Sequence, residues 1–250
     1  ANRVKNVAVL RAVINSIRPN ESFVRELSTT SEKTDTKPML KDFFGVDEIV
    51  SRHRPMIKIG DKVPKKDFET SFVAPNACVI GEVELYDNNT IGYGAVLRGD
   101  LSSIFIGGLS SVGDKTVINT VSTLSTGFPA KVIIGHFTTI EAGCTLTSCI
   151  VGNLCKVGLG SVIEQGAIME KESVLLPGSV LSSGSYVKSG EIWGGNPAAF
   201  VEKVNYIEKQ KFKPEAKKIF ASSKIHLNEF NPDNMAFKHS EELAEKGIIV

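Results

Sequence analysis

The chain has 250 residues with 29 Lys and Arg against 28 Asp and Glu, so its net charge of +1 provides no overall field that would attract nucleic acid or an anionic membrane. Hydrophobic residues make up 42%, enough for a core, whereas aromatic residues make up only 7%, which suits an interior too narrow for large rings. No stretch approaches about 18 uninterrupted apolar residues, so the sequence predicts no membrane-spanning helix.

Residues 1–18 predict a basic amphipathic helix within an N-terminal extension, 1–55. The segment carries basic side chains and no acidic ones, and at 100° per residue its aliphatic side chains fall within an arc of about 120°. The basic residues are Arg3, Lys5, Arg11 and Arg18, and the aliphatic ones are Val7, Leu10, Val13, Ile14 and Ile17. Such a helix suits an import sequence, a membrane-surface helix or a docking helix, and all three stay open.

A six-residue period governs the chain from Val73 to Trp193 and predicts a β-helix over 56–198. Aliphatic residues recur every six positions, and the residue two positions before each is usually small. The aliphatic series are Val79, Leu85, Ile91 and Leu97; Ile106, Val112 and Ile118; Ile134, Ile140 and Leu146; and Val151, Val157, Ile163, Met169, Leu175, Leu181 and Val187. Three such units would close one coil, with each inward aliphatic side chain contributing roughly 1.5 to 3 kcal/mol of burial.

The register of the repeat slips after Arg98-Gly99-Asp100 and again at 120–131. The second stretch is rich in Ser, Thr, Gly and Pro and predicts a protruding loop. Gly92, Gly152 and Gly158 directly follow an aliphatic position, and we expect them to adopt positive φ at corners of the coil.

The cysteines are Cys78, Cys144, Cys149 and Cys155, with no CxxC pair among them. The last three are spaced by five and six residues, which matches the repeat. We therefore predict reduced thiols that fill the interior, with a zinc cluster of Cys144, Cys149 and Cys155 as the alternative.

The C-terminal region, 199–250, predicts helices and a tail. Asn196-Pro197 is typical of a helix N-terminus, so we expect one helix from Ala198 to about Lys211 and a second from Pro214 to about Leu227. The polar run from Asn228 predicts a tail or a partner-binding arm.

Several segments resemble the γ-class carbonic anhydrases, particularly those built into complex I of plants and protists. The segments are Ser51-Arg52-His53-Arg54, Phe72-Val73-Ala74-Pro75, Val96-Leu97-Arg98-Gly99-Asp100, Val157-Gly158-Leu159-Gly160 and Ile192-Trp193-Gly194-Gly195-Asn196-Pro197-Ala198. The resemblance runs from about 51 to 204 and implies a mostly β, left-handed parallel β-helix that forms a trimer. In active members of that family, three histidines hold zinc between subunits, two from one subunit and one from its neighbour.

On this resemblance, the three zinc-ligand positions fall on Asn119, Ala142 and Thr147, none of which replaces an imidazole toward zinc. The resemblance therefore implies no catalytic residue, metal or cofactor in this chain, and zinc only at an interface between partner subunits.

Other polar residues of the family site are retained as Arg98, Asp100 and Asp114. We expect Arg98 and Asp100 to form a charge-assisted pair, with a relic of the catalytic network as the alternative. His136 is expected to be a corner residue at the surface rather than a ligand.

The resemblance implies a non-catalytic structural or assembly subunit of mitochondrial respiratory complex I (NADH:ubiquinone oxidoreductase). The expected arrangement is a heterotrimer with two related γ-carbonic-anhydrase subunits, peripheral to the matrix side of the inner membrane and mounted on the membrane arm. A membrane-surface contact by residues 1–18 is one of the three roles left open above, and no nucleic acid is expected. Two alternatives remain: a zinc carbonic anhydrase with unconventional ligands among Asp114, His136 and Cys144, and a hexapeptide acyltransferase, for which His136 is the candidate base.

Overall fold

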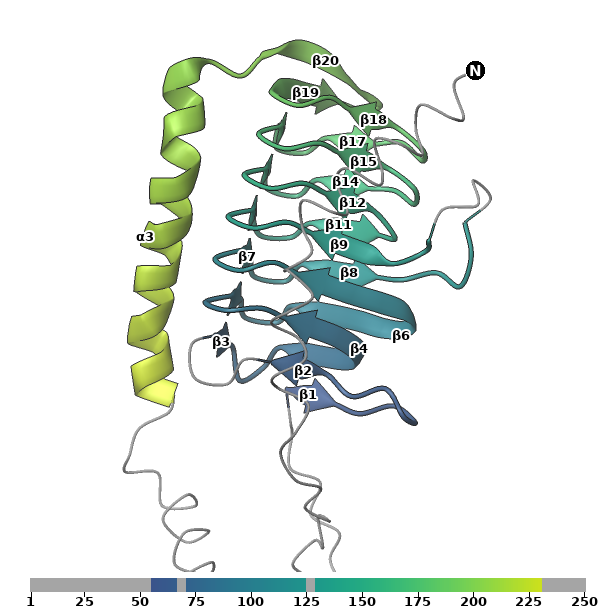
Figure 1. Cartoon of the computed structure of the whole chain (residues 1–250), viewed down its shortest axis with the longest axis vertical. Coiled ribbons are helices and arrows are strands. Elements are labelled where there is room, and N and C mark those ends of the chain that lie inside the picture. The colour runs from purple at the N-terminus through teal and green to yellow at the C-terminus, as the bar shows by residue number, and fades with distance from the viewer. Residues whose placement is uncertain (1–54, 67–70, 125–128, 231–250) are drawn as a thin grey trace, which may run out of the picture. The chain divides into compact units, whose positions relative to one another are not determined.

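The computed structural model describes residues 55–66, 71–124 and 129–230, all of which belong to a compact unit that begins at Pro55. The predicted amphipathic helix at 1–18 and the chain beyond residue 230 lie outside the described residues. The described part is a mostly β, left-handed parallel β-helix with one C-terminal helix (Figure 1). The fold class predicted from the six-residue period is confirmed, except that one helix stands where we expected two.

Each full coil contributes a strand to each of three faces, and successive coils pair in parallel. The helix-covered face contains β3 (Phe72–Val73), β5 (Thr90–Ile91), β7 (Ser111–Val112), β10 (Thr139–Ile140), β13 (Lys156–Val157), β16 (Val174–Leu175) and β19 (Glu191–Gly195), and ends in β20 (Ala198–Lys203). The site face contains β1 (Met56–Ile57), the first halves of β4 (Cys78–Leu85) and β6 (Val96–Ile106), β8 (Val117–Asn119), β11 (Thr145–Thr147), β14 (Val162–Ile163) and β17 (Val180–Leu181). The third face contains β2 (Lys65–Lys66), the second halves of β4 and β6, β9 (Val132–Ile134), β12 (Ile150–Val151), β15 (Ile168–Met169) and β18 (Tyr186–Val187).

The predicted aliphatic series form the core. Every member is at most 3% exposed, because the period of six returns the same inward position at each strand. The small residues beside them are also buried at most positions, among them Ala77, Asn89, Ala95, Ser161 and Ala167. The register slip after Arg98-Gly99-Asp100 falls within β6, and the predicted loop at 120–131 falls between β8 and β9, where the described residues form no strand.

The cysteines are free thiols, as predicted. Cys144, Cys149 and Cys155 are buried beside the aliphatic ladders. Burial raises the pKa of Cys149 to about 12 and that of Cys155 to about 11, so both stay protonated at physiological pH. They therefore act as small apolar fillers.

The positive φ expected at Gly92, Gly152 and Gly158 is wrong. Positive φ is found instead two residues further along, at Gly94, Leu154 and Gly160, where φ is +67°, +58° and +66°. Gly158 is required for a different reason: a Cβ there would lie 2.5 Å from the backbone nitrogen of Pro177 in the next coil. The glycine that follows the aliphatic position thus permits close stacking of coils rather than a left-handed turn.

The predicted helix from Ala198 to Lys211 is also wrong over its first part. Ala198–Lys203 forms β20, which runs antiparallel to β19 with Trp193 opposite Phe200. Asn196-Pro197 lies in the turn between these strands instead of starting a helix. Pairing satisfies backbone groups that β19 would otherwise leave open at the end of the sheet, and this outweighs local helix preference.

A single helix, α3 (Tyr206–Phe230), replaces the two that we expected, and Pro214 lies inside it instead of starting a second helix. Its start is capped by Asn205, whose backbone N–H donates to the Glu208 carboxylate three residues on. The helix continues through Pro214 because Phe212 and Ala216, on either side of it, are buried against the three-faced β-helix, which we call the prism.

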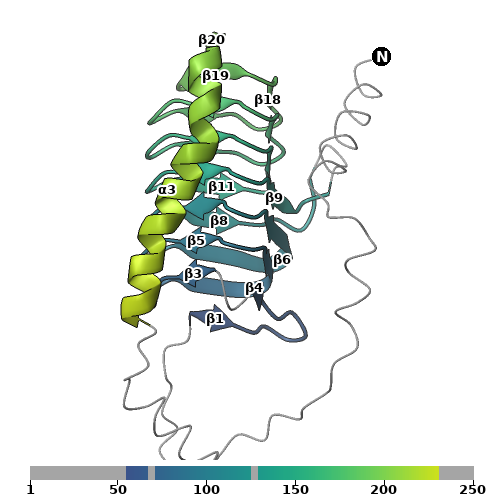
Figure 2. The same cartoon turned by 60° about the vertical axis from the view of Figure 1, so that its left-hand side comes forward.

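Helix α3 runs along the prism beside the helix-covered face, as the two views in Figures 1 and 2 agree. Two ion pairs tie it to the coils: Lys156 Nζ to Glu215 Oε1 at 2.7 Å, and Lys209 Nζ to Glu172 Oε2 at 2.7 Å. Near the other end of the helix, the Tyr93 hydroxyl and His226 Nδ1 are 2.9 Å apart. The helix therefore covers one face and leaves the site face without a described element over it.

Candidate functional site

The predicted site residues fall into two groups on the prism. Arg98, Asn119 and Thr147 occupy the same register position on three neighbouring strands of the site face, β6, β8 and β11. Neighbouring strands are about 4.8 Å apart, so these residues form one vertical column. Ala142 lies apart from this column, at the corner between β10 and β11. Two of the three ligand-equivalent positions are therefore adjacent on one face, and the third is at a corner.

Arg98 and Asp100 form the predicted charge-assisted pair, with Arg98 Nη2 2.6 Å from Asp100 Oδ2. The hydrogen bond from Arg98 lowers the pKa of the Asp100 carboxyl. Asp100 Oδ1 also accepts the Leu101 backbone N–H at 2.9 Å, and the Thr120 hydroxyl donates to the Arg98 carbonyl oxygen at 3.0 Å. These bonds brace the chain where β6 turns from the site face to the third face.

Asp114 braces a corner of the prism. Its Oδ1 accepts the backbone N–H of Tyr93, in the preceding coil, at 2.7 Å. Glu141 braces a corner of its own coil in a similar way: its Oε2 accepts the backbone N–H of Leu159, in the following coil, at 2.8 Å. The Asp114 carboxylate is thus engaged within the fold, away from the column of Arg98, Asn119 and Thr147.

His136 lies at the corner that joins β9 to β10, where its Nδ1 accepts the Gly108 backbone N–H at 2.8 Å. That bond requires the tautomer with hydrogen on Nε2. Its ring also meets the Tyr86 ring edge-on, with centroids 6.0 Å apart. The residue is half-buried at a corner, and this contact with Gly108 was not predictable from the sequence.

Asp114, His136 and Cys144 do not converge. Cys144 is buried and its thiol donates to the Gly158 carbonyl oxygen at 3.2 Å. Among the described residues, no group of three or more His, Cys, Asp or Glu side chains is placed to hold a metal ion.

The residues at the positions predicted to correspond to the zinc ligands do not fit zinc. Ala142 has no donor atom, and the amide of Asn119 and the hydroxyl of Thr147 are poor substitutes for imidazole. The Asn119 Oδ1 atom is buried, yet it has no hydrogen-bond partner among the described residues. This acceptor therefore lies beneath the surface of the site face, covered by the chain itself.

A second feature of the site face escaped the sequence analysis. The residues directly before the inward aliphatic positions point outward and are mostly β-branched, and the structure stacks them in register. We call this set the outward column: Cys78, Val96, Val117, Thr145, Val162 and Val180, all half-buried. The signal was present in the sequence as a mostly apolar residue one position before each inward aliphatic residue of the site face.

No family model matches the chain. The chain is 39% identical to "Gamma carbonic anhydrase 3, mitochondrial" of Arabidopsis thaliana over 218 residues, which cover 86% of this chain and 83% of that protein. It is also 39% identical to "Gamma carbonic anhydrase-like 1, mitochondrial" of the same plant over 198 residues, covering 79% and 78%. Among solved structures, it resembles a hexapeptide transferase family protein from Anaplasma phagocytophilum with a TM-score of 0.63 and 37% identity, covering 68% of this chain and 96% of that one.

The stacked six-residue coils define the chain as a hexapeptide-repeat β-helix protein. Within that class, identity to curated relatives over most of both chains shows that it belongs to the γ carbonic anhydrase family.

Proposed function

We propose that this chain is a non-catalytic, γ-carbonic-anhydrase-like subunit of mitochondrial respiratory complex I, where it assembles with two related subunits into a heterotrimer. In this proposal it sits peripherally on the matrix side of the membrane arm. The observation that carries it is an intact β-helix in which Asn119, Ala142 and Thr147 stand at the positions assigned to the zinc ligands. Any zinc then belongs to an interface between partner subunits.

The names of the relatives support the mitochondrial location. The two named above carry "mitochondrial" in their names, and one of them is called carbonic anhydrase-like. A chain of this family that keeps the fold but not the imidazoles retains what assembly needs and lacks what carbon dioxide hydration needs.

The site face supports an assembly role. The outward column gives this face an apolar strip. Leu159, at a corner of the coil that comes after the coil containing Ala142, is 57% exposed. A neighbouring subunit packed against this face would bury the strip.

The alternatives have less support. A zinc enzyme with ligands from Asp114, His136 and Cys144 would need them to converge, whereas each is bonded at a different place. An acyltransferase would use His136 as its base, but the Nδ1 of that ring already accepts a backbone N–H.

Affinity purification of the tagged chain from gently solubilised mitochondrial membranes tests the assembly proposal. We expect two related γ-carbonic-anhydrase subunits and complex I membrane-arm subunits to copurify in constant ratio. Recovery of homotrimers alone, without respiratory subunits, would contradict the proposal.

Metal analysis of the purified chain tests its non-catalytic part. We expect zinc far below one ion per chain and carbon dioxide hydration at the rate of buffer alone. Stoichiometric zinc together with hydration that a chelator abolishes would overturn this part while leaving assembly in complex I open.

A further inference from the structure

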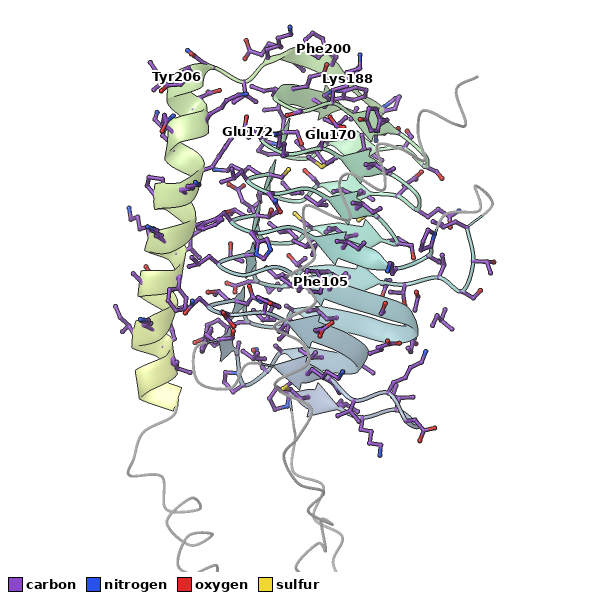
Figure 3. The ribbon with its side chains drawn as sticks, in the orientation of Figure 1. Phe105, Glu170, Glu172, Lys188, Phe200 and Tyr206 are labelled. Atoms are coloured by element: carbon purple, nitrogen blue, oxygen red, sulfur yellow. The ribbon has the colours of Figure 1, made fainter. Side chains whose placement is uncertain are left out.

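The outer side of α3 is a strongly basic surface. We call it the lysine face: Lys211, Lys217, Lys218 and Lys224, together with Tyr206, Ile207 and Ile225. At 100° per residue these residues fall within an arc of about 140°, on the side of α3 away from the buried Phe212, Ala216 and Ser223. Tyr206 is 72% exposed at the start of the helix, where Figure 3 labels it, and Ile225 near the other end is 66% exposed.

The acidic side chains described on α3 do not neutralise this surface. Glu215 is turned to the prism and pairs with Lys156, and Glu208 accepts the N–H of the capping Asn205. The inward-facing Lys209 pairs with Glu172, which lies on the side of the prism toward α3 (Figure 3). No lysine of the lysine face forms an ion pair with another described residue, so their charges are available to a partner.

We propose that the lysine face binds an anionic lipid surface, with α3 lying flat on the headgroups. The cations of α3 are lysines, with no arginine in the helix. Arginine is enriched and lysine depleted in protein–protein interfaces, whereas lysines act on anionic headgroups as mobile point charges that need no fixed geometry. Over 25 residues the helix is about 37 Å long, so its lysines reach the same plane, and Tyr206, Ile207 and Ile225 supply apolar contacts toward both ends.

This inference does not depend on the loss of the zinc site or on complex I. It states which side of the prism meets a bilayer, and it adds a contact to the one left open for residues 1–18.

Sedimentation of the full chain with vesicles tests it. The vesicles are phosphatidylcholine alone or phosphatidylcholine with about one-third phosphatidylserine, and we expect binding only to the second kind, weakening as salt is raised. Replacing the lysines of the lysine face together (K211Q, K217Q, K218Q, K224Q) is expected to reduce the partition coefficient about a hundredfold or more at low salt, since each lysine near such a surface contributes roughly fivefold. Gln and Lys have similar helix propensity, so α3 is expected to persist in the variant, which its circular dichroism checks.

A matched variant removes the same charge from exposed prism lysines: K58Q, K115Q, K171Q and K188Q. Because both variants keep residues 1–18 and the same net charge, a selective loss in the helix variant supports the lysine face. Equal losses in both variants, or no loss in either, would overturn the proposal. So would binding of the full chain to polyglutamate without binding to the anionic vesicles.

Acetylation of lysines followed by mass spectrometry gives a second readout. Anionic vesicles are expected to protect Lys217 and Lys218 while leaving Lys115 reactive. Protection of Lys115 with continued labelling of Lys217 and Lys218 would place the bilayer on another side of the prism and refute the inference.

Discussion

Gly158 and Gly160 stand two residues apart at one corner of the prism, but a methyl group would meet very different surroundings at each. A Cβ on Gly158 would lie 2.5 Å from the Pro177 backbone nitrogen and 2.8 Å from the Leu176 carbonyl carbon. A Cβ on Gly160 would meet nothing within 4 Å, although φ there is +66°. Gly158→Ala therefore tests coil spacing, and Gly160→Ala tests backbone conformation alone.

The expected costs follow from these distances. Ordinary contact begins near 3.4 Å, so Gly158→Ala must move the coils apart by about 0.9 Å, which breaks the 2.8 Å bond from the Gly158 N–H to the Leu175 carbonyl oxygen. Loss of one or two ladder hydrogen bonds at about 1 kcal/mol each, with the strain of overpacking, gives a loss of about 3 kcal/mol in unfolding free energy. Gly160→Ala is expected to cost about 1 kcal/mol, since an L residue pays about 1 to 2 kcal/mol in the left-handed region and gains part of it back in the unfolded chain.

Urea unfolding at one fixed protein concentration measures both losses, because the apparent stability of an oligomer depends on concentration. Gly178→Ala, with φ of +68° and open space, is a second control that should behave like Gly160→Ala. A Gly160→Ala loss equal to or larger than that of Gly158→Ala would refute the close-stacking role of Gly158.

Three further predictions concern the site face and the interior. The first is a triple variant, Asn119→His, Ala142→His and Thr147→His, which is expected to create a zinc site between copies of the chain and to bind about one zinc per chain. The double variant without Ala142→His should bind much less zinc. Equal zinc binding by the two variants would contradict the ligand position assigned to Ala142. Asn119→Leu removes a buried acceptor that has no partner among the described residues. The unfolding free energy of the isolated chain, measured by urea unfolding, is therefore expected to stay level or rise by about 1 kcal/mol. A loss of more than about 2 kcal/mol would show that the Asn119 oxygen accepts a hydrogen bond in the folded chain. Iodoacetamide at about pH 8 should label the half-buried Cys78 in the folded protein and spare Cys149 and Cys155. The raised pKa values of Cys149 and Cys155, about 12 and about 11, keep their thiolate forms scarce until the pH approaches 11. Rapid labelling of Cys149 at about pH 8 would contradict this explanation.

The β-helix was predictable because its inward positions obey one rule along the chain. Ile163 and Leu175 face the core because, within an unbroken run of the repeat, six residues return the strand to the same phase. The small residues and the thiols followed from the same period.

The interactions that were missed depend on partners from other coils. The need for glycine at Gly158 arises from the backbone of Pro177, nineteen residues on, and the bond at His136 from Gly108. The local pattern at Asn196-Pro197 favoured a helix, but the residues that follow it pair with the open edge of β19 and form a strand. The lysine face became visible only once α3 proved continuous through Pro214.

The reversal of chain direction at β20 has a consequence for assembly. A parallel solenoid has no intrinsic length, because each coil presents the next with the same template of amide and carbonyl groups, including a coil from another molecule. On the helix-covered face, the antiparallel strand changes the spacing of these groups and carries the chain away toward α3, so a further coil finds no matching template on that face. One short hairpin thus blocks end-to-end stacking on one of the three faces, whereas β17 and β18 are the last strands of the other two.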